Sequence, residues 1–404
     1  MSEGEESLLE GRIWIVGCFD FAHHGHSGAM LQARQQGNEL YVGVHSDEEI
    51  LHNKGPTVMK LDERVIAVDG CRWCTKVIPN APYVTDPNFM DKYRCKFVVH
   101  GDDITTDANG EDCYKIVKDL GRFLIVKRTP NISTTDLVGR MLENNNKDHH
   151  LKDINSIDLN NYLNNAHSNT DNKIHPIFEK DMINRFKSYA SSSNGLTSGV
   201  PVYIYTKDTE EITEIIKGSD DETSESDKES IVYYIDGSFD LFTPGHIMAL
   251  KTLKQLSNTN SNTNAKSIKV IVGIHSDSVV NNYKNLNYPI MNIIERSLCV
   301  LQSKYIDGLI LNAPYEPTQS FLQNLSNSMK ISKIIRFNSP MDETHYSYKD
   351  AQGIVELPDY KYNDVTTENI VNRVLKDREA YEARQKRKGW KSQHEKVLEA
   401  NEKS

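Results

Sequence analysis

Short apolar runs alternate with amphipathic stretches through the first third of the chain. The apolar runs lie at 13–16, 40–44, 76–78, 97–99 and 123–126. Between them, apolar residues recur at the three- and four-residue spacing of a helix face. These helix-like stretches lie at 27–35, 61–68, 88–93, 111–120 and 133–142. A short uninterrupted apolar run is typical of a strand buried on both faces, so the alternation predicts an α/β domain with a doubly wound parallel sheet.

The same pattern returns in the second half of the chain. The stretch 235–246 mirrors 15–26, and 272–277 mirrors 42–47. From 59–83 the match continues without a gap, at a constant offset of 232 residues. Convergence does not keep a register that long. We therefore interpret the chain as an internal duplication that forms two tandem Rossmann-like domains.

Composition divides the chain further. We expect an N-terminal catalytic domain over 11–145, a linker over 146–230, a second, degenerate domain over 231–375 and a basic helical tail over 376–404. An Asn-rich tract at 143–173 is predicted to be a disordered insertion, because it cannot bury a core. Residues 174–206 have enough apolar content for an ordered connector. The linker segment 207–229 holds ten acidic residues against three lysines.

That acidic segment accounts for most of the net charge of −10, so no basic face for nucleic acid is predicted. No apolar run approaches the roughly eighteen residues of a membrane helix, and the chain begins with the acidic MSEGEES. We expect a soluble, cytoplasmic protein with no integral membrane segment. Cys71-x-x-Cys74 has no second pair at zinc-site spacing, so these cysteines are interpreted as structural thiols and no protein-held metal is assigned.

The most informative stretch joins the first predicted strand to the first helix. Gly17 ends the strand, and His23-x-Gly25-His26 follows. Such a turn presents free backbone N–H groups and the positive end of a helix dipole. Gly25 lets a ligand approach the backbone, and imidazoles three residues apart can reach one anion. We interpret the stretch as a phosphate site, although these four residues alone would also fit a simple helix cap.

Further polar clusters in the first copy fall where they would meet this turn at the carboxyl edge of the sheet. They are Lys54 in a flexible-looking loop, His100-Gly101-Asp102-Asp103, Arg128-Thr129, and Ser133-Thr134 at the start of the last helix. Each has an ordinary alternative as a solvated lysine, a turn or an N-cap. Together they favour a second anion cradle opposite the first.

The three motifs at 17–26, 100–103 and 128–135 resemble the signatures of the cytidylyltransferase family, within the wider H-x-G-H nucleotidyltransferases. The tandem copies and the lack of a long amphipathic membrane helix are similar to the branch of that family that acts on phosphoethanolamine. One departure is Asn131, where the family has Gly. Because Asn tolerates a left-handed backbone, the turn is expected to survive.

The resemblance implies transfer from CTP to phosphoethanolamine, giving CDP-ethanolamine and diphosphate, in phosphatidylethanolamine biosynthesis. It assigns catalytic roles to His23, His26, Lys54 and Arg128. It assigns CTP binding to these two histidines, Lys54 and Arg128, and to Cys18, Phe19, His100, Gly101, Asp102, Asp103, Thr129, Ser133 and Thr134. It assigns the phospho-substrate to Asp20 and Arg72. Mg²⁺ is expected with CTP, without a dedicated carboxylate cage.

Alternatives stay open at this point. Another small phosphate ester, such as phosphocholine or glycerol phosphate, would suit the same phosphate cradle. A nucleotide-sensing scaffold with a dead site is a rival from outside enzymology. Whether the protein forms a homodimer is also open. The basic tail is interpreted as a solvated helix with at most weak contact to a membrane surface.

The second copy keeps the pattern and loses polar residues. Thr243 replaces His23, Arg336-Phe337-Asn338-Ser339 replaces 100–103, and Lys361-Tyr362 replaces Arg128-Thr129. We expect a scaffold or regulatory lobe. Its degenerate site would comprise Ser238, Phe239, Asp240, His246 and Lys284.

Overall fold

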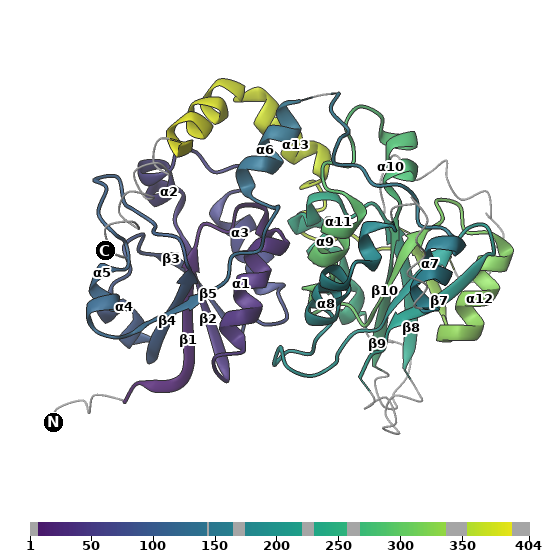
Figure 1. Ribbon diagram of the computed structural model, residues 1–404, viewed down its shortest axis with the longest axis horizontal. Helices are drawn as coiled ribbons and strands as arrows, with labels where there is room; N and C mark the ends of the chain where they lie inside the picture. Colours follow the sequence, from purple (N-terminus) through teal and green to yellow (C-terminus); the bar gives the residue numbers. More distant parts are fainter. Residues whose placement is uncertain are drawn as a thin grey trace. The chain divides into compact units, whose positions relative to one another are not determined.

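The structure is a computed structural model (Figure 1). It describes residues 7–143, 145–164, 174–219, 230–256, 267–336 and 354–389. The chain divides into two compact units. The first unit comprises Met1–Leu142 and Thr367–Ser404, and the second comprises Glu143–Thr366.

Five parallel strands form the sheet of the first unit, in the order β3-β2-β1-β4-β5. They are β1 (Leu9–Gly17), β2 (Glu39–His45), β3 (Lys76–Ala81), β4 (Cys95–Gly101) and β5 (Phe123–Val126). In the central strand, Ile15 is in register with Val42 on one side and Val99 on the other. The apolar run 13–16 is buried, as expected for a strand covered on both faces. The predicted doubly wound parallel sheet is confirmed.

Helices cover both faces of this sheet, with α1 and α3 on one side and α4 and α5 on the other (Figure 1). The helical elements are η1 (Asp20–Ala22), α1 (His24–Arg34), α2 (Asp47–Asn53), α3 (Leu61–Asp69), α4 (Pro87–Lys92), α5 (Lys115–Asp119) and α6 (Thr134–Leu142). Sequence reasoning missed α2. Its signal was the N-cap Ser46, whose side chain accepts from Glu49 N, before a first turn of three acids.

The second sheet repeats this order and extends it to β12-β11-β8-β9-β10-β6-β7. Its strands are β6 (Val202–Thr206), β7 (Glu211–Ile216), β8 (Ile231–Gly237), β9 (Ile268–His275), β10 (Gly308–Ala313), β11 (Lys333–Arg336) and β12 (Ile354–Glu356). Its helical elements are α7 (Ser156–Leu163), η2 (Pro176–Phe178), α8 (Lys180–Tyr189), η5 (Asp240–Phe242), α9 (Pro244–Gln255), α10 (Asp277–Lys284), α11 (Ile293–Leu301) and α12 (Gln319–Met329). Strand β6 pairs parallel with β10, and β7 pairs antiparallel with β6.

These added strands correct the predicted linker over 146–230. Residues 145–164 and 174–219 belong to the second unit, and β6 and β7 are part of its sheet. Ile154 and Leu159 are buried, and Asn312 Nδ2 donates to the carbonyls of Ile154 and Tyr205, each at 3.0 Å. The prediction of disorder failed here because the high Asn content masked these apolar positions. The segments 165–173 and 220–229 lie outside the described residues.

The C-terminal boundary also differs from the prediction. Helix α13 (Thr367–Lys376) packs against α6, and both belong to the first unit (Figure 1). Its apolar face, with Ile370 and Val374 fully buried, makes that packing favourable. Residues 378–389 continue as a helix in the same unit, and residues 390–404 lie outside the described part of the chain.

One buried arginine ties three loops together in each copy. Arg64 donates to the carbonyls of Met59, Cys18 and His45, and to Asp47 Oδ1 at 2.6 Å. In the second copy, Arg296 makes the same four contacts with Met291, Ser238, His275 and Asp277. Because both copies keep the network, we interpret it as part of the fold rather than of the chemistry.

Candidate active site

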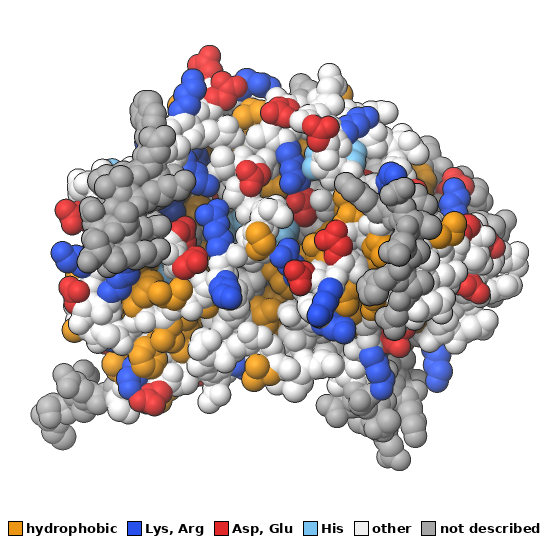
Figure 2. Space-filling model, in the orientation of Figure 1, with side chains coloured by type: hydrophobic (Ala, Val, Ile, Leu, Met, Phe, Trp, Pro, Cys, Tyr) orange, Lys and Arg blue, Asp and Glu red, His pale blue; other side chains and the backbone are white. Residues whose placement is uncertain are grey.

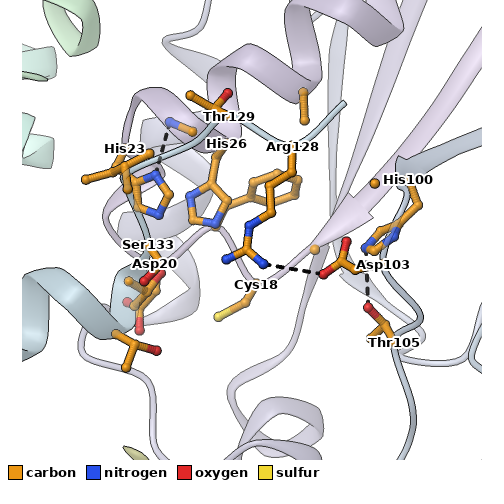
Figure 3. Close-up of a pocket in the computed structure, with 18 of the residues that line it drawn as sticks. Cys18, Asp20, His23, His26, His100, Asp103, Thr105, Arg128, Thr129 and Ser133 are labelled. Atoms are coloured by element: carbon orange, nitrogen blue, oxygen red, sulfur yellow. Dashed lines mark hydrogen bonds and ion pairs between the residues drawn. The ribbon is translucent and has the colours of Figure 1, made fainter. Parts of the chain in front are cut away.

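A pocket of about 320 Å³ opens at the carboxyl ends of the strands in the first unit. Its walls come from the ends of β1, β4 and β5, from the starts of α1 and α6, and from the helix at 378–389. It lies beside β1 and β4, where the strand order reverses, which is the usual ligand position in a doubly wound sheet. Figure 3 shows the side chains that converge there.

Most of the predicted site residues line this pocket. They are Cys18, Phe19, Asp20, His23, His26, Lys54, His100, Gly101, Asp103, Arg128, Thr129, Ser133 and Thr134. Asp102 and Arg72 are not among the lining residues. Asp102 is exposed beside the pocket. Arg72 lies in the turn before β3, away from the described lining of this pocket, and its assignment to the incoming phosphate stays a prediction.

The two histidines of the H-x-G-H motif stack face to face over the turn (Figure 3). Their ring centroids are 3.9 Å apart, with 20° between the planes. His23 Nδ1 accepts from Gly25 N at 3.1 Å, which places the His23 proton on Nε2. His23 Nε2 and His26 Nδ1 are buried and have no hydrogen-bond partner among the described residues. Buried polar atoms are normally satisfied, so these two nitrogens indicate a ligand.

Both imidazoles are neutral at pH 7. Burial, followed by the neighbouring His26 and His24, holds the pKa of His23 well below its usual range. Burial, followed by Lys54 and Lys388, lowers the pKa of His26 to about 3. The pair therefore meets a ligand as hydrogen-bonding groups rather than as fixed charges.

The turn beneath them has a strained backbone. Phe19, Phe21 and Ala22 have φ angles of 56°, 64° and 41°, in the left-handed region. Each such residue costs on the order of 1–3 kcal/mol. The second copy repeats the strain at 239, 241 and 242, with φ angles of 47°, 58° and 40°. The conformation therefore belongs to the fold, and the difference between the copies lies in the side chains.

Asp20 has a structural role that differs from the predicted one. Its carboxylate oxygens accept from Val58 N and Met59 N, each at 2.9 Å. The equivalent Asp240 likewise accepts from the backbone of Ile290 and Met291. Although Asp20 lines the pocket, it is 1 % exposed and these bonds engage its carboxylate. The bonds give Asp20 a role in positioning residues 58 and 59, and its assignment to the phospho-substrate stays a prediction.

Cationic side chains gather at the pocket. The Arg128 guanidinium lies 3.6 Å from the Asp103 carboxylate, and both are largely exposed (Figure 3). The Lys54 ammonium lies 5.5 Å from the centre of the Tyr83 ring, at the C-terminal end of α2. Lys54 was predicted from its loop. Other residues that line the pocket were missed by sequence reasoning: Asn53, Thr105, Lys127, Arg384, Arg387 and Lys388.

His100 closes another side of the pocket. Its ring packs on Tyr114, with centroids 4.6 Å apart, and its Nε2 lies 3.5 Å from Thr105 Oγ1. Its Nδ1 is buried without a partner among the described residues. Burial lowers the pKa of His100, although the negative charge of Asp103 opposes this effect. The ring is therefore neutral at pH 7.

The start of α6 abuts the start of α1. Asn131 has a φ of 64°, so it adopts the left-handed conformation that the sequence predicts at this turn. A Cβ on Gly25 would lie only 2.8 Å from Ile132 Cγ2, which explains the glycine. Ser133 Oγ accepts from Asp136 N at 3.1 Å and caps the helix. The starts of two helices, α1 and α6, therefore flank one pocket, and each brings the positive end of a helix dipole to it.

In the second copy, the loss of one histidine changes the role of the other. Thr243 caps α9, and His246 Nδ1 accepts from Thr243 N at 3.1 Å. The imidazole that corresponds to His26 is thus used in the helix cap. The turn of the second copy keeps the contacts and backbone conformation of the fold at Ser238, Phe239 and Asp240. The Lys284 ammonium lies 5.7 Å from the centre of the Tyr288 ring. Arg336 ends β11, while 337–339 lie outside the described residues.

Comparison with known proteins agrees with this geometry. The family described as cytidylyltransferase-like matches residues 14–140 and 234–373. The two matched segments correspond to the two sequence repeats. The fold and the first site thus define a nucleotidyltransferase of the cytidylyltransferase-like class.

Curated relatives narrow the class. The chain is 37 % identical to the probable ethanolamine-phosphate cytidylyltransferase of Schizosaccharomyces pombe, over 96 % of each chain. It is also 37 % identical to the ethanolamine-phosphate cytidylyltransferase of Mus musculus, over 95 % of this chain and 90 % of the mouse protein. Choline-phosphate cytidylyltransferase A of Mus musculus is 42 % identical, but over only 32 % of this chain. The chain belongs to the ethanolamine-phosphate cytidylyltransferase family.

Two observations concern the charge of the surface and the possibility of a membrane-spanning helix. Among the described residues on the visible face, acidic and basic side chains are interspersed (Figure 2). Within the described residues, no helix has the length and apolar character to cross a membrane.

Proposed function

We propose that the first unit transfers a cytidylyl group from CTP to phosphoethanolamine, giving CDP-ethanolamine and diphosphate. The observation that carries the proposal is the pair of buried, unpartnered ring nitrogens on His23 and His26, which line a pocket with Lys54 and Arg128. A polyanionic ligand would satisfy both the nitrogens and the cations. The family membership supplies the nucleotide and the phosphate ester.

In this proposal, a phosphate oxygen of phosphoethanolamine attacks the α-phosphorus of CTP. The new P–O bond forms as the bond to the β-phosphate breaks, and diphosphate leaves with that electron pair. No covalent bond to the protein is needed. Catalysis then depends on positioning and on neutralising charge that builds on the leaving diphosphate. His23 and His26 would donate to phosphate oxygens, while Lys54 and Arg128 would offset the negative charge.

Mg²⁺ belongs to this proposal as a companion of CTP. Within the described residues, no group of three or more His, Cys, Asp or Glu side chains is placed to hold a metal. Mg²⁺ is commonly held by one or two carboxylates and the phosphates of a substrate, and Asp103 is a carboxylate in the pocket. When bound, Mg²⁺ would offset charge on the phosphates. A cytoplasmic location and a homodimer stay predictions.

The pocket lining favours phosphoethanolamine over phosphocholine. Quaternary ammonium groups are typically recognised by a cage of aromatic rings. Phe19 is the one Phe, Tyr or Trp among the described lining residues, while Trp73 and Tyr83 are buried in the core. The first unit therefore offers no such cage within the described pocket.

Diphosphate release tests the proposal. The protein would be incubated with phosphoethanolamine and CTP, ATP or GTP in separate reactions. We expect rapid release with CTP and at least about tenfold slower release with the purine nucleotides. Comparable release with all three, or none with CTP, would contradict it.

A further inference from the structure

The C-terminal helix at 378–389 and α13 form hydrogen bonds with residues 56–58, the segment that follows Lys54 at the pocket. Three consecutive carbonyls, at 56–58, accept hydrogen bonds from this part of the chain. Arg384 Nη1 donates to the first carbonyl, the Tyr381 hydroxyl donates to the second at 3.0 Å, and Arg373 Nη1 donates to the third at 3.3 Å. From its other side, Asp20 accepts from the N–H groups of residues 58 and 59.

The helix also delivers cations to the pocket itself. Arg384, Arg387 and Lys388 line it, although they lie more than 250 residues from Arg128 in sequence. Lys388 Nζ donates to Thr135 Oγ1 at 2.6 Å, at the start of α6. This places the ammonium beside the helix start opposite the stacked histidines.

The cations repel one another. Although Lys388 as a whole is exposed, loss of water around its ammonium, and then the charges of Arg128, Lys54 and Arg384, lower its pKa to about 8. The acids nearby are few: Asp103 lies beside Arg128, Asp136 opens α6, and Asp20 is engaged by backbone and lies 3.5 Å from Arg384. A polyanion would relieve this repulsion.

We propose that Lys388 binds the terminal phosphates of the nucleotide and of the leaving diphosphate, so that the C-terminal helix forms one wall of the active site. The proposal deepens the proposed function and rests on it for the identity of the nucleotide. It corrects the expectation of a solvated tail for residues 378–389. The bonds to the carbonyls at 56–58 would couple docking of this helix to the position of Lys54.

Binding of inorganic diphosphate tests this subsite without requiring turnover. Lys388→Gln removes the charge and keeps a polar side chain. Lys386→Gln is the matched control, because Lys386 lies on the same helix, is exposed and does not line the pocket. In calorimetry on the full chain, we expect Lys388→Gln to weaken diphosphate binding by at least about tenfold and Lys386→Gln to change it less than about twofold.

Steady-state kinetics separates this proposal from the wider function. We expect Lys388→Gln to raise KM for CTP while leaving KM for phosphoethanolamine within about twofold. Unchanged diphosphate binding in Lys388→Gln, or equal losses in both variants, would overturn the subsite. If Lys388-dependent diphosphate binding is present but CTP and phosphoethanolamine give no product, the subsite stands and the proposed function fails.

Discussion

Arg373 donates to both carboxylate oxygens of Glu63, at 2.6 and 2.7 Å. Glu63 is 4 % exposed and opens α3, while Arg373 lies on α13. Residues 310 positions apart therefore form a bidentate ion pair within the first unit. The pair anchors α13 just before the helix that lines the pocket.

This ion pair predicts a stability effect. Glu63→Gln should lower the free energy of unfolding by about 1.5–3 kcal/mol, the usual range for hydrogen bonds to charged groups. Urea unfolding measures it. The control is Glu382→Gln, which removes an exposed pair with Arg378 and should cost less than about 0.5 kcal/mol. Equal losses in the two variants would show that the pair does not anchor α13.

The two repeats should differ in their response to loss of a histidine. His23→Ala should lower kcat by about a hundredfold or more, because His23 is placed to contact charge that develops on the phosphates. His246→Ala removes a cap contact in the second copy and should change kcat much less. Initial rates with saturating CTP measure both. Similar losses in the two variants would place the chemistry elsewhere.

Because the buried histidines are neutral in the folded protein, we expect the free energy of unfolding to fall in acid. Because the pKa of His26 is lowered to about 3, the unfolded chain binds its proton more readily than the folded chain. The contribution of neutral His26 to the free energy of unfolding is therefore fully present above about pH 6.5, and it is lost as the pH falls toward about 3. Once the pH is well below 6.5, the loss approaches about 1.4 kcal/mol per pH unit.

Urea unfolding at pH 5, 6 and 7 checks the sign of this effect. His26→Gln should reduce the slope of stability against pH, because the titrating group is gone. His52→Gln is the control, since His52 is exposed on α2 and its removal should leave the slope unchanged. A wild-type protein that grows more stable from pH 7 to pH 5, or an unchanged slope in His26→Gln, would contradict the assignment.

Helix α7 should prove structural despite its Asn-rich sequence. Leu159→Ala should destabilise the second unit by about 2–4 kcal/mol, because Leu159 is 4 % exposed and the change leaves a cavity. Leu163→Ala on the same helix is the control, since Leu163 is 49 % exposed. Urea unfolding distinguishes them. Equal effects would show that α7 does not pack as described.

The sequence predicts best the features that local patterns encode. The strand-to-helix turn at His23 and His26 follows from a strand end, a glycine and two histidines within ten residues. The left-handed conformation of Asn131 follows from its side chain and its place in the motif. The parallel direction of the strands follows from the alternation of strands and helices, because parallel strands need crossover connections.

Long-range packing explains what the sequence could not show. Arg384 and Lys388 lie in a basic run whose sequence also fits a solvated helix. They line the pocket because the C-terminal residues pack into the first unit, far from their neighbours in sequence. Asp20 lines the pocket, yet two backbone N–H groups engage its carboxylate. Sequence spacing does not reveal that competition.

Comparison of phosphate esters tests the central claim most directly. Purified protein with CTP would be given phosphoethanolamine, phosphocholine or glycerol phosphate, and formation of each CDP product would be followed. A pocket that leaves polar groups unpaired with the wrong ligand discriminates strongly, so phosphoethanolamine should be preferred by at least about a hundredfold in kcat/KM. Comparable kcat/KM values for phosphoethanolamine and either rival would contradict the proposed substrate.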